Sequence, residues 1–132
     1  MTAKRHDIFT GKPVEKKYQY TPAVVAVKAG LVFISGQAGW DENGNIVGAS
    51  DPTVQARKAF ENLRDVLAAA GASFAGIIKE TEYVTDLTQY REIARVRQEF
   101  VSSPFPAATL VEVKGLFKKG QLFEIDVVAL LD

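Results

Sequence analysis

Hydrophobic and polar residues alternate in five segments of this chain, and each such segment predicts a β-strand. The first two, residues 22–28 and 31–35, are joined by Ala29-Gly30, whose glycine permits a tight turn. They predict a hairpin. A third alternating segment, residues 77–85, mixes apolar and polar side chains on both faces.

Apolar residues three and four positions apart predict two helices between the strands. Asp51 and Pro52 are typical of the N-cap and first position of the first helix, which ends at Gly71. The second helix begins at Asp86 or Thr88 and ends before a Ser-Ser-Pro sequence. The order of elements is therefore β-β-α-β-α-β-β.

The two C-terminal segments, residues 107–114 and 122–131, are predicted to pair as a second β-hairpin. The turn-rich sequence GLFKKG lies between them, and no helical spacing separates them. Because side chains of a strand alternate between its two faces, Glu124 and Asp126 lie on the same face of the last strand.

The face that carries Glu124 and Asp126 is otherwise apolar, since Leu122, Val128 and Leu130 share it. One interpretation is a solvated edge on which charge prevents aggregation. The other is a covered surface, where the carboxylates are hydrogen-bonded in a pocket or at a subunit interface. The three apolar residues favour the covered surface.

These elements predict an α+β fold, with a single mixed β-sheet and two helices on one of its faces. The length of 132 residues predicts one domain, residues 1–132, and residues 1–20 lack periodicity and are expected to form a terminal arm. The other face of the sheet needs a cover. Copies of the same chain in a symmetric homo-oligomer are expected to supply it.

Composition and charge exclude several classes of function. The 16 basic and 16 acidic residues cancel, which disfavours nucleic acid as a partner. The chain has no Cys and one His, so thiolate chemistry, disulfides and His- or Cys-based metal sites are not expected. No motif predicts a metal, nucleotide or flavin cofactor. No apolar run has membrane-spanning length, so we expect no membrane partner and a cytoplasmic location.

Four sequence motifs resemble the YjgF/Rid family of small reactive-intermediate (imine) deaminases. They occur in the family's order and are ISGQ at 34–37, QARKAFENLRDVLAAAG at 55–71, YVTDL at 83–87, and FPAATLVEVKGL followed by FEIDVVAL. The resemblance covers most of the chain from about Val24 onward. It implies a chorismate-mutase-like fold, a homotrimer, and small-molecule ligand pockets in clefts at the subunit interfaces.

The resemblance also implies candidate site residues. Glu124 matches the family's catalytic glutamate, which helps to position a water that attacks an imine carbon. Ser35 and Gly36 match the segment that borders the substrate. Ala108 occupies the substrate-binding position at which the family has an arginine that holds the substrate carboxylate. Lys114 is about two pleats further along the strand, which is too far to replace that arginine.

Aromatic residues near the candidate site have two interpretations. The single tryptophan, Trp40, begins a loop, where it either lines a pocket or covers an edge of the core, the commoner role of a loop tryptophan. Tyr18 and Tyr20 likewise either pack over a pocket or serve ordinary packing.

Three functions are compatible with these residues. The first is Rid-like hydrolysis of an imine or enamine, including one without a carboxylate, to a carbonyl product and ammonia through Glu124 and a water. The second is a non-catalytic ligand-binding or interaction homotrimer. The third is the endoribonuclease or translation-inhibitor role attached to the family by name, which the neutral charge disfavours.

Overall fold

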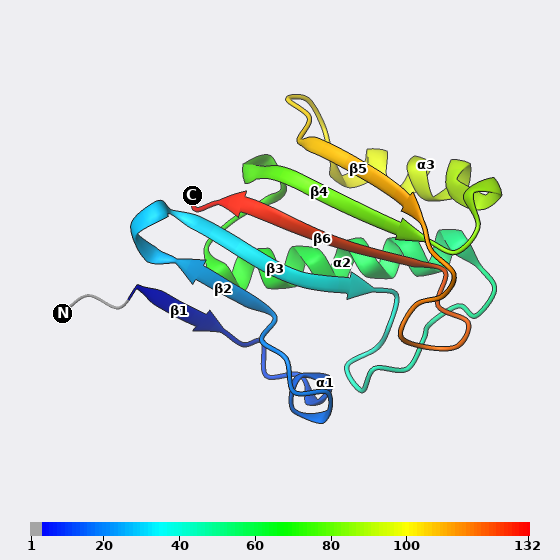
Figure 1. Cartoon of the computed structure of the whole chain (residues 1–132), viewed down its shortest axis with the longest axis horizontal. Helices are drawn as coiled ribbons and strands as arrows, with labels where there is room; N and C mark the ends of the chain where they lie inside the picture. Colours follow the sequence, from blue (N-terminus) through cyan, green and yellow to red (C-terminus); the bar gives the residue numbers. More distant parts are fainter. Residues whose placement is uncertain (1–3) are drawn as a thin grey trace.

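Six strands form one mixed sheet in the computed structural model, which describes residues 4–132 (Figure 1). The strands are β1 (Arg5–Ile8), β2 (Ala23–Ala26), β3 (Leu31–Ala38), β4 (Ile77–Val84), β5 (Ala107–Glu112) and β6 (Phe123–Leu130). Their order across the sheet is β1-β2-β3-β6-β4-β5, and every neighbouring pair is antiparallel except β4 and β5. The predicted α+β fold and the first hairpin, β2–β3, are confirmed.

Two long helices, α2 (Pro52–Ala70) and α3 (Tyr90–Phe100), lie behind the same face of the sheet (Figure 1). Asp51 caps α2, because its side chain accepts a hydrogen bond from the Val54 backbone N–H at 3.1 Å. Gly71 ends α2 in the left-handed conformation at φ 80°. Both predicted helices are therefore confirmed on one face of the sheet. Within residues 4–132, no helix is long and apolar enough to cross a bilayer.

The predicted C-terminal hairpin is wrong, because β5 and β6 do not pair with each other. β6 lies between β3 and β4 and is antiparallel to both, whereas β5 is an edge strand parallel to β4. Burial explains the difference: alternate residues of β6 are buried in the core, while all six residues of β5 are exposed in the single chain. Alternation in the sequence identified both strands but not their partners.

The core lies between the sheet and α2. Phe123, Ile125, Val127 and Ala129 of β6 are buried on the helix side, and the Phe60 ring of α2 stacks on Phe123 with centroids 5.8 Å apart. Burying each of the larger side chains stabilises the fold by about 1.5–3 kcal/mol. The opposite residues of β6, including Glu124, are left on the face without helices.

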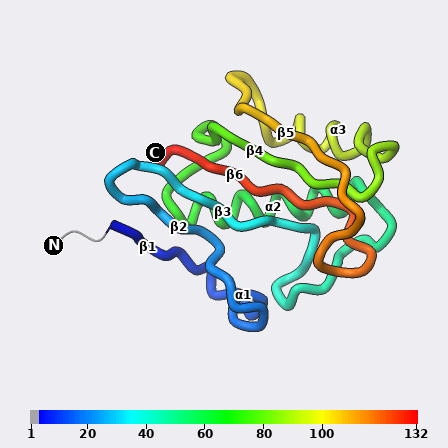
Figure 2. The backbone as a smooth tube through the Cα atoms, in the orientation of Figure 1, coloured from blue at the N-terminus to red at the C-terminus, as the bar shows by residue number. Residues whose placement is uncertain are grey.

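Residues 4–20, which were expected to be part of a terminal arm, contain β1 and the short helix α1 (Pro13–Lys17); residues 1–3 of that arm lie outside the described residues. β1 pairs with β2 at the sheet edge. Three short 3₁₀ turns complete the chain: η1 (Val27–Ala29), η2 (Phe74–Gly76) and η3 (Leu87–Gln89). Figure 2 shows that α1, the loop after β3 and the loop before β6 gather near one end of the sheet.

Candidate functional site

An open pocket of about 510 Å³ lies where these three segments gather. Three of the predicted site residues, Ser35, Gly36 and Glu124, line it. Most of the remaining lining is aromatic and comes from Tyr18, Tyr20, Trp40 and Phe117. The structure therefore brings the predicted glutamate and the predicted β3 segment together in one chain.

Glu124 is the acidic residue of this pocket. The Gln121 side-chain amide donates a hydrogen bond of 3.0 Å to Glu124 Oε1, so one carboxylate oxygen is fixed. Loss of solvent around the half-buried side chain raises the pKa of Glu124 above its usual range; the Gln121 hydrogen bond opposes this rise, and the charge of Asp126 adds to it. A carboxylate with a raised pKa is a stronger base near neutral pH.

Gly36 leaves room for the Glu124 carboxylate. A Cβ atom at position 36 would overlap Glu124 Oε2 and would lie 2.7 Å from its carboxyl carbon. The ladder between β3 and β6 is irregular here, because the register shifts between Ile34 and Gln37. This bulge places the glycine backbone against the glutamate, which explains why a Gly follows Ser35 in the middle of a strand.

Ser35 has a positioning contact in the single chain. Its hydroxyl donates a hydrogen bond of 2.6 Å to the Thr21 carbonyl oxygen, and its backbone N–H donates to the Pro22 carbonyl at 2.9 Å. Ser35 thus fixes the start of β2, directly after the segment that carries Tyr18 and Tyr20. We assign it to the pocket wall as a residue that positions this segment.

Ala108 does not reach the pocket within one chain. It lies on β5, where it pairs with Glu80 of β4, and both β4 and β6 separate it from β3. Its side chain is exposed. The resemblance placed Ala108 in the same cleft as Glu124, and only a second copy of the chain could bring its β5 edge to this pocket.

The aromatic wall resolves the open interpretation of Trp40, which lines the pocket. The rings of Tyr18 and Trp40 are nearly parallel, with an interplanar angle of 13° and centroids 6.3 Å apart. The Tyr20 ring is tilted relative to Trp40, with centroids 6.4 Å apart, and the Phe117 ring meets Tyr18 edge to face, with centroids 4.9 Å apart. Phe117 was not identified from the sequence, where its segment indicated a turn.

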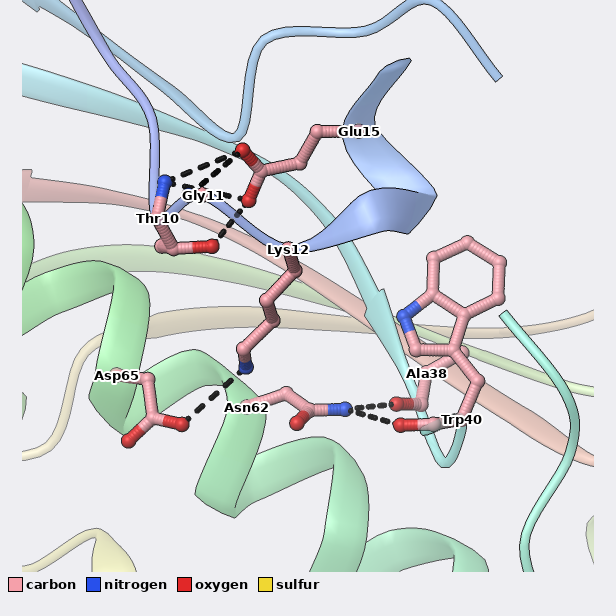
Figure 3. Close-up of polar contacts among 8 residues, drawn as sticks. All are labelled: Thr10, Gly11, Lys12, Glu15, Ala38, Trp40, Asn62 and Asp65. Atoms are coloured by element: carbon pink, nitrogen blue, oxygen red, sulfur yellow. Dashed lines mark hydrogen bonds and ion pairs between the residues drawn. The ribbon is translucent and has the colours of Figure 1, made fainter. Parts of the chain in front are cut away.

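Polar side chains of α2 hold the wall in place (Figure 3). The buried Asn62 side-chain amide donates to the carbonyl oxygens of both Ala38 and Trp40, each at 2.9 Å. Lys12 Nζ contacts Asp65 Oδ2 at 3.3 Å and ties the N-terminal segment to the same helix. The segment before the tyrosines is therefore anchored to α2 at Lys12, and the segment of the tryptophan is anchored at Ala38 and Trp40.

Two further contacts stabilise these segments. The Glu15 carboxylate accepts hydrogen bonds from the Thr10 hydroxyl and from the backbone N–H groups of Thr10 and Gly11 (Figure 3). Gln55 of α2 donates to the Gly120 carbonyl and accepts from the Leu122 backbone N–H, both at 2.8 Å. Gln55 thereby fixes the end of the loop that carries Phe117.

Two lysines stand at the aromatic wall. Lys17 Nζ lies 5.3 Å and Lys118 Nζ lies 4.9 Å from the centroid of the Tyr18 ring. The hydrogen bond with Lys118 is the main cause of a lowered pKa of Tyr18, and Lys17 contributes in the same direction. Across the part of the chain that the structure describes, neither lysine forms an ion pair with a carboxylate.

A separate group of ionisable residues is buried between β4 and α3. Arg97 of α3 contacts Glu80 Oε1 at 2.5 Å and Glu82 Oε1 at 3.4 Å, and the Tyr90 hydroxyl donates to Glu82 at 3.0 Å. Burial, and secondarily the charge of Glu80, raises the pKa of Glu82 to about 7. This cluster explains why the sequence of β4 showed no clearly apolar face.

Metal binding has no support in the described residues. No group of three or more His, Cys, Asp or Glu side chains among residues 4–132 is arranged to hold a metal ion.

Comparison with known proteins identifies the family. The model of the family described as endoribonuclease L-PSP matches residues 11–131. The chain is 36% identical over 108 residues to the RutC family protein y4sK of Sinorhizobium fredii, covering 81% of this chain and 85% of that protein. It belongs to the endoribonuclease L-PSP family, also called the YjgF/YER057c/UK114 or Rid family, which confirms the predicted resemblance.

Two other relatives extend the similarity over nearly the whole chain. Human 2-iminobutanoate/2-iminopropanoate deaminase is 29% identical over 126 residues, covering 96% of this chain and 90% of that protein. The crystal structure of RidA from the Antarctic bacterium Psychrobacter sp. PAMC 21119 superposes with a TM-score of 0.84 at 30% identity, covering 96% and 99% of the two chains.

Proposed function

We propose that the protein hydrolyses a reactive imine or enamine to a carbonyl product and ammonia, with a water positioned by Glu124. The observation that carries this proposal is the placement of Glu124. Its half-buried carboxylate lines a pocket of about 510 Å³ beside the glycine that makes room for it. Membership of the Rid family, in which a relative is named as an imine deaminase, supports the same chemistry.

The proposed reaction needs one base and one water. A protonated imine is already electrophilic at carbon, so an oriented water attacks that carbon while Glu124 accepts a proton from the water. The resulting carbinolamine carries a hydroxyl and an amine on the same carbon. Glu124 returns the proton to the amine, and the C–N bond breaks with its electrons on nitrogen, so that ammonia leaves. The hydroxyl gives its proton to the Glu124 carboxylate as the carbonyl forms. An enamine first takes a proton at carbon and becomes the imine.

The proposal includes a homotrimer in which another copy completes the pocket. In the single chain, β5 is an exposed edge, and Phe33 of β3 is 49% exposed on the face without helices. Phe33 pairs with Val24 of β2 and Val128 of β6, which gives an apolar row across three strands. Burial of this row against other copies would bring an edge such as β5, with Ala108, to a neighbouring pocket. A cytoplasmic location stays a prediction.

The test is hydrolysis of imines that are generated in the assay from amino acids by an oxidase. Ammonia release by the wild type should exceed spontaneous hydrolysis, and Glu124→Gln should lower it by about 100-fold or more, because a general base is lost. Glu92→Gln is the control, because Glu92 is an exposed glutamate of α3 that does not line the pocket.

Equal rates for the wild type and Glu124→Gln would remove Glu124 from the mechanism. No acceleration of any tested imine by correctly assembled wild type would instead favour the non-catalytic ligand-binding or interaction homotrimer.

A further inference from the structure

We propose that the substrate of this pocket carries both an aromatic ring and a carboxylate, with the ring on the Trp40 wall and the carboxylate on Lys17 and Lys118. The inference rests on the proposed function, because it names the substrate class for the same site. It assigns to two lysines of this chain the binding of the substrate carboxylate, which the uncharged Ala108 side chain cannot provide.

The size and lining of the pocket favour a ring. A volume of about 510 Å³ falls within the ~300–1,000 Å³ typical of pockets for drug-sized ligands. Tyr18 pairs with both Trp40 and Phe117 in the aromatic wall, and Phe117 remains 62% exposed in the loop. A flat ring packed on this surface would gain both apolar burial and ring–ring contact. The human relative is named for two imines without a ring.

The charge at the wall favours an anion. Lys17 and Lys118 both approach Tyr18, at 5.3 and 4.9 Å from its centroid, and within residues 4–132 no carboxylate pairs with either ammonium. A ligand carboxylate beside the Tyr18 ring would therefore have two ammonium groups near this ring that pair with no carboxylate of the described chain. Lys17 itself lines the pocket.

A positively charged ligand is the main alternative to a carboxylate, because aromatic walls also bind cations such as quaternary ammonium groups. Here the ammonium groups of Lys17 and Lys118 already lie over the Tyr18 ring, where a ligand cation would otherwise bind. They would repel a third positive charge. Glu124 is the acidic lining residue, and its Oε1 already accepts a hydrogen bond of 3.0 Å from the Gln121 side-chain amide. The observations therefore favour an aromatic carboxylate over an aromatic cation.

Binding can be measured without turnover, because Trp40 is the single tryptophan of the chain and lines the pocket. The full-length protein is titrated with four stable ligands while Trp40 fluorescence is followed, and calorimetry repeats each titration. The ligands are 3-phenylpropanoate, with ring and carboxylate; butanoate, without the ring; 3-phenylpropanamide, without the charge; and 3-phenylpropylamine, with the opposite charge.

We expect 3-phenylpropanoate to bind most tightly. Removing both charges in a Lys17→Gln/Lys118→Gln variant should weaken its binding by about 5-fold or more and leave binding of the amide unchanged. Lys119→Gln is the matched control, since it removes an exposed lysine of the same loop that, unlike Lys17 and Lys118, makes no contact with the Tyr18 ring within residues 4–132. Phe117→Ala should weaken both the carboxylate and the amide, because both present the ring.

The outcomes separate this inference from the proposed function. Preferred binding of 3-phenylpropanoate with no hydrolysis of any imine would uphold the inference and reject the hydrolase. Hydrolysis with butanoate bound as tightly as 3-phenylpropanoate would do the reverse. Tighter binding of the amine, an equal effect of Lys119→Gln, or no binding of any ligand at millimolar concentration would each overturn the inference.

Discussion

At the scale of single residues, the pocket depends on a glycine that leaves room for the proposed catalytic carboxylate beside it. Gly36 is necessary for steric reasons alone, since a Cβ there would overlap the carboxylate of Glu124. The resemblance identified Glu124 and Gly36 separately. Their contact follows from the bulge in β3. The bulge could not be predicted from the sequence, because Ser-Gly is common at the ends of ordinary strands.

Gly36→Ala should therefore impair hydrolysis more than folding. The added methyl group forces the end of a flexible glutamate side chain to move, which costs less than about 1–3 kcal/mol of stability, while the base leaves its position. Rate measurements and urea unfolding on the same preparation test this. Gly115→Ala is the control, because no atom of the described chain lies within 4 Å of a Cβ there. Equal effects of the two substitutions on the rate would contradict the steric argument.

Glu82 predicts a stability that depends on pH. Its pKa rises from 4.5 in the unfolded chain to about 7 in the fold, so the folded state binds the proton more tightly. Its contribution is fully present below pH 4.5 and is lost as the pH rises through about 7, by an amount on the order of 3 kcal/mol. Glu80, Arg97 and Tyr90 are the charged and titratable groups that face it.

Glu82→Gln should remove much of this loss, because a neutral side chain still accepts the hydrogen bond from Tyr90. The measurement is urea unfolding of both proteins at pH 5 and pH 8, at one protein concentration, since assembly also affects apparent stability. The variant should gain stability relative to wild type at the higher pH. If the difference in unfolding free energy between variant and wild type is the same at pH 5 and pH 8, Glu82 does not titrate in this range.

At the scale of elements, local periodicity predicted which segments are helices and strands but not how the strands pair. α2 and α3 were found from their apolar spacing and caps, and β6 from its phase. β5 and β6 were wrongly paired because sequence neighbours often form hairpins, whereas here β4 lies between them. β1 and α1 have only four and five residues and are largely exposed, so they carry too little periodicity to be detected.

α2 supports the pocket through two buried polar side chains, Gln55 and Asn62. Asn62→Ala removes two hydrogen bonds to the Ala38 and Trp40 carbonyls, which are left without that donor. Because Asn62 is 4% exposed, we expect a loss of about 1–3 kcal/mol in unfolding free energy, together with a shift in Trp40 emission. Asn43→Ala, at an exposed loop position, should change neither quantity. A stable variant with unchanged emission would mean that Asn62 does not hold the wall.

At the scale of the whole molecule, the site combines segments that are far apart in the sequence. Ser35, Gly36 and Glu124 were predicted because they belong to motifs that the family shares. The aromatic wall has no such motif: its residues come from positions 18–20, 40 and 117, and only the fold brings them together. Ala108 lies at the far edge of the sheet, so its place in any pocket depends on assembly.

Assembly itself is expected to depend on the apolar row formed by Val24, Phe33 and Val128. Phe33 is 49% exposed in the single chain, so Phe33→Asp leaves the core between sheet and helices intact. A charge in the proposed interface would have to be buried without a partner, which opposes association. Light scattering should therefore find a homotrimer for wild type and a folded monomer for Phe33→Asp at micromolar concentration.

Phe9→Asp provides the matched control for this experiment. Phe9 is 59% exposed, but it follows β1 at the opposite edge of the sheet from β5, so its replacement should leave the trimer unchanged. If Phe33→Asp also abolishes hydrolysis while keeping the circular dichroism of the fold, a neighbouring copy contributes to the pocket. A monomeric wild type would refute the trimer and, with it, any role for Ala108 beside Glu124. Full activity in a monomeric Phe33→Asp would show instead that one chain contains the complete site.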